Sequence, residues 1–150
     1  MTTVAAITSV TIYADTSFFV SLYLPDRRTS DVERRISSRP SLWMTSLHVA
    51  ECTHAIELHV FRKAITRSEA DRALQRFQEH RSQKLWRESP LPERAFEVCA
   101  QLAQRHAARL GVRTLDTLHV ASALELKVER FWSFDERQVR LALAAGLKTG

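Results

Sequence analysis

The sequence has few of the residues that mark fibrous, disordered or disulfide-stabilised chains. Three Gly and four Pro in 150 residues exclude collagen-like repeats and Pro/Gly-rich low complexity. The two cysteines, Cys52 and Cys99, form no Cys-x-x-Cys pair, and we interpret them as reduced, partly buried thiols. With 45% hydrophobic and 26% charged residues, the composition predicts one globular domain over residues 1–150.

Signals for membrane insertion and export are also missing. No stretch approaches the roughly 20 apolar residues that span a bilayer. Residues 1–10 lack the basic segment and long apolar core of a signal peptide, and we expect residues 1–9 to be a flexible extension. These observations predict a cytoplasmic protein with no membrane partner.

Zinc-binding patterns are absent too. His48, His54 and His59 lack His-Glu-x-x-His order, and no Cys/His set has zinc spacing.

The net charge is less informative: 22 Lys and Arg against 17 Asp and Glu give a net charge of +5. A positive field attracts polyanions, so the charge permits a nucleic-acid partner without selecting one.

The residues that are present alternate between strand and helix patterns. Strands are predicted at 10–14, 42–45, 131–134 and, weakly, 85–86. Helices are predicted at 18–24, from about 30 to before Pro40, 47–63, 66 onward, 95–110, 114–126 and from 135 to near 146, with Pro92 expected in the first turn of the fifth. Such alternation predicts a three-layer α/β/α fold with a mainly parallel central sheet, whose ligands bind at the carboxyl ends of the strands.

Four acidic residues lie at or near these strand-to-helix turns. Asp15 and Asp135 each follow a predicted strand, and Glu51 lies early in the helix after the second strand. Asp116 shares a helix face with apolar residues, so its carboxylate is expected to point toward packed material. Taken singly, Asp15 and Asp135 are more often helix caps, Glu51 is more often a solvated residue, and the two interpretations of Asp116 are about even.

The combination favours a metal site over four unrelated acids. Carboxylates crowded at one sheet edge repel each other, which raises pKa values and destabilises the fold unless a cation lies among them. Ligands that are all oxygen favour hard ions, so Mg²⁺ or Mn²⁺ is the expected occupant.

At these residues the sequence resembles the PIN-domain nucleases, and specifically the VapC-type toxins. The matching segments are YADTS at 13–17, Ala50-Glu51, LDTLHVA at 115–121 and SFD at 133–135. The Asp-x-Leu-His-x-Ala block is the most specific of them. Ser133 stands where the family often has Thr, Thr117 stands where Ala is common, and a final edge strand is expected to be short or missing.

The resemblance implies a PIN-like fold and a division of roles. Asp15, Glu51, Asp116 and Asp135 would hold Mg²⁺ or Mn²⁺ for phosphodiester cleavage, with Ser17 and Ser133 as supporting hydroxyls. It also implies a VapB-like antitoxin that points a cationic side chain into the acidic site, and a homodimer. The helices at 18–24 and 49–61 would offer a groove for the antitoxin, although core packing explains their apolar residues equally well.

The expected activity is therefore endoribonuclease cleavage by the toxin of a toxin–antitoxin pair. Basic residues close in sequence to the acids are candidate phosphate contacts, although each alone is more often a solvated charge: Arg27, Arg28, Arg62, Lys63, Arg113 and Arg137. A catalytically silent PIN scaffold that binds RNA or a protein is the alternative. A haloacid-dehalogenase-type phosphatase would need a second Asp where Ser17 stands, and a receiver domain would need a late Lys that we do not find.

Overall fold

The computed structural model describes residues 10–150, and the predicted extension at 1–9 lies outside the described residues. Five parallel strands form one sheet in the order β3-β2-β1-β4-β5. The strands are β1 (Thr11–Ala14), β2 (Ser41–Thr45), β3 (Arg87–Ser89), β4 (Arg130–Trp132) and β5 (Lys148–Thr149). This confirms the predicted α/β class and parallel sheet.

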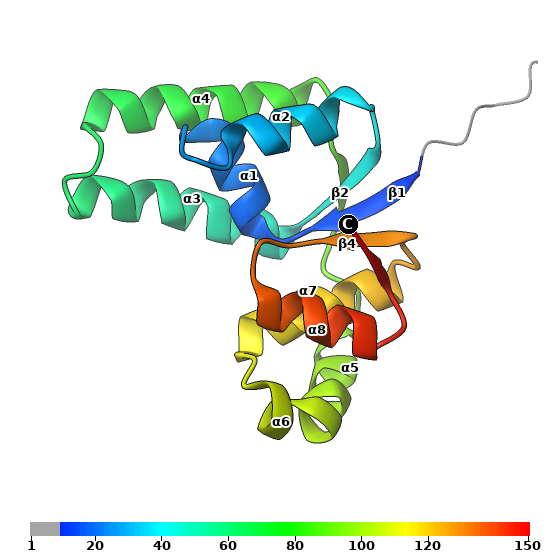
Figure 1. Ribbon diagram of the computed structural model, residues 1–150. Coiled ribbons are helices and arrows are strands. Elements are labelled where there is room, and N and C mark those ends of the chain that lie inside the picture. The colour runs from blue at the N-terminus through cyan, green and yellow to red at the C-terminus, as the bar shows by residue number, and fades with distance from the viewer. Residues whose placement is uncertain (1–9) are drawn as a thin grey trace, which may run out of the picture.

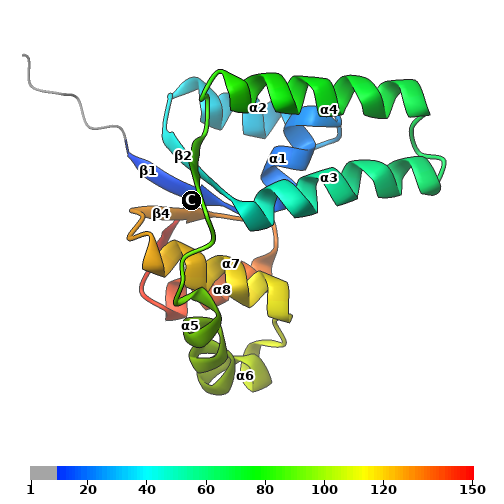
Figure 2. The same cartoon turned by 180° about the vertical axis from the view of Figure 1, so that it is seen from behind.

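Helices cover both faces of the sheet (Figures 1 and 2). On one face lie α1 (Thr16–Tyr23), α2 (Thr29–Ser37), α3 (Ser46–Phe61) and α4 (Arg67–Ser82). On the other lie α5 (Ala95–Leu102), the π-helical turn η1 (Ala103–Ala107), α6 (Ala108–Leu110), α7 (Thr114–Glu125) and α8 (Glu136–Ala144). None of the helices described is long and apolar enough to span a bilayer.

Alternation along the central strands divides the core in two. On β1, Ile12 and Ala14 pack toward α1–α4, whereas Tyr13 packs toward α5–α8. On β4, Phe131 and Trp132 divide in the same way. A strand that is buried on both faces is apolar on both, and the run Ile12-Tyr13-Ala14 made this segment recognisable as a strand.

Local signals place several helix ends correctly. The Thr66 side chain accepts a hydrogen bond from the Glu69 N–H at 3.1 Å, and the Glu69 carboxylate accepts one from the Thr66 N–H at 3.3 Å, which is the predicted capping box. Gly111 ends α6 at φ 68°, a left-handed conformation that suits glycine.

Three predictions of local structure need correction. The third strand is Arg87–Ser89 and not 85–86, because the apolar Trp86 is used for packing beside the strand. Pro92 precedes α5 in a turn, with its carbonyl accepting a hydrogen bond from the Ala95 N–H at 2.9 Å. The strand expected at 131–134 ends at Trp132.

The order of the strands fixes where a ligand can bind. The chain runs outward from β1 to β2 and β3, and later returns to add β4 on the other side of β1. Loops that leave β1 and β4 therefore diverge toward opposite faces of the sheet, which opens a crevice at the carboxyl ends of these two strands. The short final strand β5 then pairs with β4 at the edge of the sheet.

Candidate metal-binding acidic site

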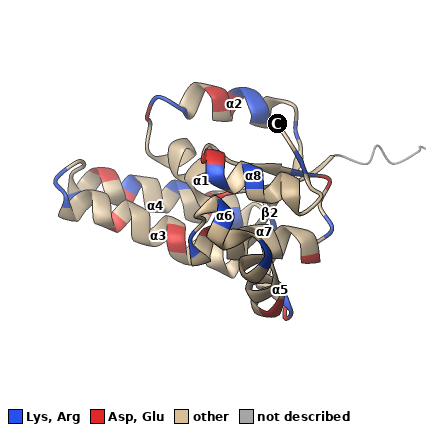
Figure 3. Cartoon of the chain, turned by 60° about the horizontal axis from the view of Figure 1, so that its bottom comes forward, with Lys and Arg blue, Asp and Glu red and all other residues tan. Residues whose placement is uncertain are grey.

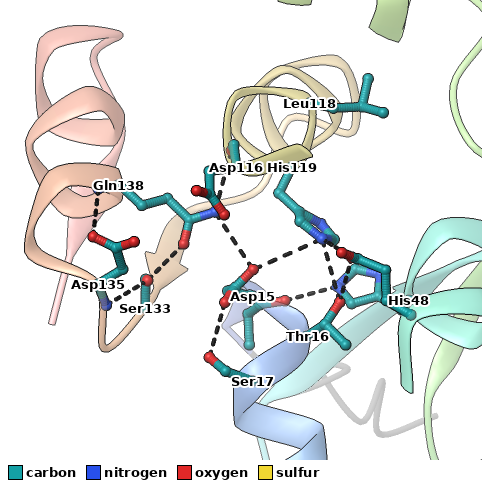
Figure 4. A network of polar contacts seen from close by, with 12 residues as sticks. Asp15, Thr16, Ser17, His48, Asp116, Leu118, His119, Ser133, Asp135 and Gln138 are labelled. Atoms are coloured by element: carbon teal, nitrogen blue, oxygen red, sulfur yellow. Dashed lines mark hydrogen bonds and ion pairs between the residues drawn. The ribbon is translucent and has the colours of Figure 1, made fainter. Parts of the chain in front are cut away.

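The crevice between β1 and β4 holds the predicted acids. Asp15 is the first residue after β1, and its N–H donates to the Trp132 carbonyl of β4 at 2.9 Å. Asp135 follows β4 and precedes α8, whereas Asp116 lies in the first turn of α7. Figure 4 shows the Asp15, Asp116 and Asp135 side chains around the Gln138 amide.

Asp15 occupies a helix-cap position without acting as a cap. Its side chain accepts no hydrogen bond from the N-terminal N–H groups of α1. Instead, one carboxylate oxygen accepts from Ser17 Oγ at 2.8 Å and the other from Gln138 Nε2 at 3.4 Å. The capping interpretation therefore does not account for Asp15, whose side chain is 15% exposed.

Asp135, in contrast, is a helix cap. Its Oδ1 accepts hydrogen bonds from the N–H groups of Arg137 and Gln138, at 2.9 and 3.4 Å. Its own N–H donates to Ser133 Oγ at 3.0 Å. The capping interpretation holds for this residue, whatever else its carboxylate does.

The pKa of Asp116 is shifted by the surroundings of its carboxyl. Burial, followed by the charges of Asp15 and Asp135, raises the pKa of this carboxyl above its ordinary value. Arg113 lies 3.8 Å from Asp116 Oδ2, but the arginine side chain is 89% exposed and its charge is screened by solvent. The negative charges of these three carboxylates are therefore only partly neutralised by Arg113.

Glu51 lies in a separate network on the β1–α3 side of the crevice. Its Oε1 accepts a hydrogen bond from Thr16 Oγ1 at 2.8 Å and forms a short contact with His119 Nε2. Burial raises the pKa of Glu51, but the hydrogen bond and charge of His119, together with Thr16, outweigh burial and leave the pKa lowered. Tyr13 Oη lies 2.6 Å from Nδ1 of the same histidine.

His119 and Thr16 are residues whose roles the sequence left unassigned. His119 belongs to the Asp-x-Leu-His block and lies three residues after Asp116, so it shares a helix face with that acid. It is buried and also lies 3.7 Å from Asp15 Oδ1. Its position in the block was the available signal, whereas its contact with Glu51 spans 68 residues of sequence.

Gln138 is the other residue that sequence reasoning missed. It is fully buried in the first turn of α8 and contacts Ser133, Asp15 and the Asp116 carbonyl. A buried glutamine is uncommon, because its amide must find partners for both its oxygen and its nitrogen. Gln138 lies three residues after the capping Asp135, and no sequence motif singles it out.

The donor set fits a hard divalent cation in its chemistry. The carboxylates of Asp15, Asp116 and Asp135 are oxygen ligands of the kind that Mg²⁺ and Mn²⁺ prefer, and burial together with the charges of the other two raises the pKa of Asp116. Among residues 10–150, however, no three His, Cys, Asp or Glu side chains are already gathered closely enough to hold one ion. Because the Asp135 carboxylate is turned toward the α8 N–H groups, convergence of the three requires side-chain rotation.

Basic residues are distributed unevenly around these acids. Arg28 borders the cavity that also reaches Asp15, Glu51 and Asp116, and Arg113 and Arg137 border a neighbouring cavity with Asp116 and Asp135. Arg62 and Lys63 lie in the turn between α3 and α4, at the far end of that hairpin from the sheet (Figures 1 and 3). The structure therefore favours three of the six candidate phosphate contacts: Arg28, Arg113 and Arg137.

Comparison with known proteins gives a consistent family assignment. The family model described as PIN domain matches residues 12–143. No curated protein is significantly similar to the chain in sequence.

Solved structures share the fold at low sequence identity. FitAcB from Neisseria gonorrhoeae superposes with a TM-score of 0.67 at 18% identity, covering 92% of this chain and 95% of the other. VapC20 of Mycobacterium tuberculosis, described as a sarcin-ricin-loop-cleaving toxin, gives 0.66 at 21%, covering 91% and 95%. VapBC2 from Rickettsia felis, bound to a promoter DNA fragment, gives 0.64 at 12%, covering 94% and 98%.

Proposed function

The chain belongs to the PIN-domain family, and from that premise we propose that it is a Mg²⁺- or Mn²⁺-dependent endoribonuclease that acts as the toxin of a toxin–antitoxin pair. The observation that carries the proposal is the set of Gln138 hydrogen bonds that links Asp15, Asp116 and Asp135 in one crevice, where burial and the charges of Asp15 and Asp135 raise the pKa of Asp116. A fold that keeps such repulsion gains most when a cation lies among these carboxylates.

Each acid has a distinct part in the proposed reaction. Asp15, Asp116 and Asp135 would hold the cation, and Glu51 would orient water or complete the shell. When bound, a divalent cation lowers the pKa of water and neutralises charge on the phosphate. Phosphoryl chemistry requires mostly placement and charge neutralisation, so no covalent nucleophile is needed.

Neighbouring residues prepare these carboxylates for that task. Ser17 donates to Asp15, and Thr16 donates to Glu51, so both acids are oriented by neutral hydroxyls. Burial raises the pKa of Tyr13, so its hydroxyl stays protonated, and it lies 2.6 Å from Nδ1 of His119, whose Nε2 contacts Glu51. Ser133, the residue after β4, supports the site through Gln138 and the Asp135 N–H.

An RNA substrate is supported by the basic rim and by a relative. Arg28, Arg113 and Arg137 border the acidic cavities, where they can contact phosphates on either side of the scissile bond. Arg28 is held in place by the Phe134 ring, whose centroid lies 4.7 Å from its guanidinium carbon. The similar VapC20 is described as cleaving the sarcin-ricin loop, an RNA substrate.

The activity is tested with purified protein and a labelled RNA. Cleavage should require Mg²⁺ or Mn²⁺, stop with chelator, and be lost in Asp15→Asn and Asp116→Asn. Asp71→Asn is the matched control, because Asp71 is a solvent-exposed acid on α4, remote from the site. Undiminished cleavage in both Asp15→Asn and Asp116→Asn would overturn the metal-nuclease proposal and leave the silent-scaffold alternative.

The proposed protein partner is a VapB-like antitoxin. The relatives FitAcB and VapBC2 were crystallised as toxin–antitoxin complexes. In this chain a cavity of about 650 Å³ lies among α1, α3 and α4, and it shares Val20, Asp26 and His59 with the cavity that reaches Asp15. A partner segment lying there would be able to extend a cationic side chain to the acids.

Co-expression with the neighbouring reading frame tests this partner. A small protein that co-purifies with the chain and inhibits cleavage supports the assignment. Ala64→Arg, which places a charge in the 650 Å³ cavity at an exposed position that does not border the acids, should weaken co-purification while leaving the isolated chain active. The homodimer that the resemblance implies is tested by light scattering on the isolated chain.

A further inference from the structure

Gln138 forms hydrogen bonds to all three proposed metal-binding aspartates through one buried side chain and one N–H group. Its Nε2 donates to Asp15 Oδ1 at 3.4 Å and to the Asp116 carbonyl at 3.1 Å. Its backbone N–H donates to Asp135 Oδ1 at 3.4 Å. Among residues 10–150, no other residue has hydrogen bonds to all three.

The orientation of the amide is fixed by its partners. Ser133 Oγ accepts from the Asp135 N–H, and its proton is donated to Gln138 Oε1 at 2.6 Å. On the opposite side, Asp15 Oδ1 and the Asp116 carbonyl are both acceptors, so only the NH₂ group satisfies them. A flipped amide would place its oxygen against two other oxygens.

The hydrogen bonds of Asp15 leave room for a cation. One oxygen accepts from Gln138 and the other from Ser17, and a carboxylate has about four lone-pair positions. Both donors are uncharged. A Lys or Arg in place of Gln138 would pair with Asp15 and compete with the cation, whereas an amide orients the carboxylate and preserves its charge.

From these contacts we propose that Gln138 is the positioning residue of the metal site, which holds the Asp15 carboxylate in register with Asp116 and Asp135 and thereby sets the affinity for the divalent cation. The proposal rests on the proposed metal-dependent function and adds a residue to it. Groups that orient metal ligands typically contribute about 10–100-fold to metal affinity.

The test measures Mn²⁺ and Mg²⁺ binding by calorimetry, with the metal alone and no RNA. Gln138→Met keeps the length of the side chain and removes every amide hydrogen bond. We expect its dissociation constant for Mn²⁺ to rise about 10-fold or more. Gln101→Met, at an exposed position on α5, is the matched control and should bind as the wild type does.

A double-mutant cycle separates positioning from general loss of structure. Ser133→Ala removes the hydroxyl that orients the amide, so it should weaken Mn²⁺ binding less than Gln138→Met does. Ser133 also accepts from the Asp135 N–H, so only part of its effect passes through the amide, and the double variant should lose less affinity than the sum of the two single losses. Additive losses in the double variant would contradict the proposed pathway from Ser133 through Gln138 to Asp15.

The possible outcomes separate a failure of the Gln138 positioning role from a failure of the proposed metal-dependent function. Wild-type Mn²⁺ affinity in folded Gln138→Met would overturn the positioning role and leave the nuclease proposal intact. Failure of the wild-type protein to bind either metal would overturn the metal site itself, and the inference with it. If Gln138→Met does not fold, an unchanged dissociation constant in Ser133→Ala overturns the positioning role.

Discussion

Asp135 is both a helix cap and a proposed metal ligand, and these two roles can be separated by substitution. Asp135→Ala removes both, because alanine has no oxygen to accept from the Arg137 and Gln138 N–H groups. Asp135→Ser keeps a side-chain oxygen suited to the cap but removes the carboxylate. The metal-free stabilities of the two variants should therefore differ, while their responses to metal should be alike.

The size of the capping effect follows from the two N–H groups that lose their acceptor. Loss of such a cap costs about 1 kcal/mol, within a range of roughly 0.5–2. In a domain of this length, about 1 kcal/mol lowers the melting temperature by roughly 2–4 °C. Asp135→Ser should stay within about 0.5 kcal/mol of the wild type, because the lost attraction to the α8 dipole is offset by relief of repulsion with Asp116.

Metal binding provides the second measurement. At about 100 times its dissociation constant, a ligand stabilises the folded state by about 2.7 kcal/mol, and a tenfold weaker site gives about 1.4 kcal/mol. The rise in melting temperature with Mg²⁺ should thus fall by about half or more in both Asp135 variants. In Asp15→Asn the rise should be lost without any capping cost, because Asp15 caps no helix N–H.

Differential scanning calorimetry with and without Mg²⁺ measures both effects in one series. The capping argument is wrong if metal-free Asp135→Ser melts as low as Asp135→Ala. The assignment of Asp135 as a ligand is wrong if Asp135→Ser keeps the full metal-induced rise.

Three further predictions concern pH, thiol reactivity and packing. Folding raises the pKa of Asp116 above its ordinary 3.8, so the stabilisation from the protonated carboxyl is fully present below pH 3.8 and is lost as pH rises through the folded-state pKa. In metal-free protein, Asp116→Asn should remove this pH-dependent loss of stability. Chemical denaturation across pH measures it. Burial raises the pKa of Cys52 to about 12 and also raises that of Cys99, so both thiols should react with a thiol reagent slowly when folded and fast in denaturant; rapid native labelling of Cys52 would contradict its burial. Phe19 is fully buried against Trp86, so Phe19→Ala should cost about 3–5 kcal/mol of unfolding free energy, and a loss below about 1 kcal/mol would mean that this core is not packed as described.

The elements that the sequence predicted well are those specified by neighbouring residues. The strand at β1, the Thr66–Glu69 capping box and the left-handed Gly111 each depend on a few residues in a row. The edge strand β3 did not follow the apolar rule, because an edge strand pairs on one side only and tolerates polar residues. Leu85, which made 85–86 resemble a strand, is 52% exposed.

The resemblance named the acids and the nearby hydroxyls Ser17 and Ser133, but the contacts from residues distant in sequence could not be predicted. Asp15 and Asp135 follow strands, so parallel pairing alone brings them to one edge of the sheet. Gln138 reaches Asp15 across 123 residues, and His119 reaches Tyr13 across 106. Contacts at such separations depend on how helices pack on the sheet, which no local pattern encodes.

The hydrogen bonds that orient the acids differ in how they affect the charge of each carboxylate. The described hydrogen bonds to Asp15 come from Ser17 and Gln138, which are neutral, so the carboxylate is oriented without being neutralised. Glu51 differs, because burial raises its pKa but His119 and Thr16 outweigh burial and lower it. At Asp116, burial and then the charges of Asp15 and Asp135 raise the pKa of the carboxyl. In the proposed metal site, such an arrangement would be destabilising without metal, and a bound hard cation would relieve that cost where a neutral ligand would not.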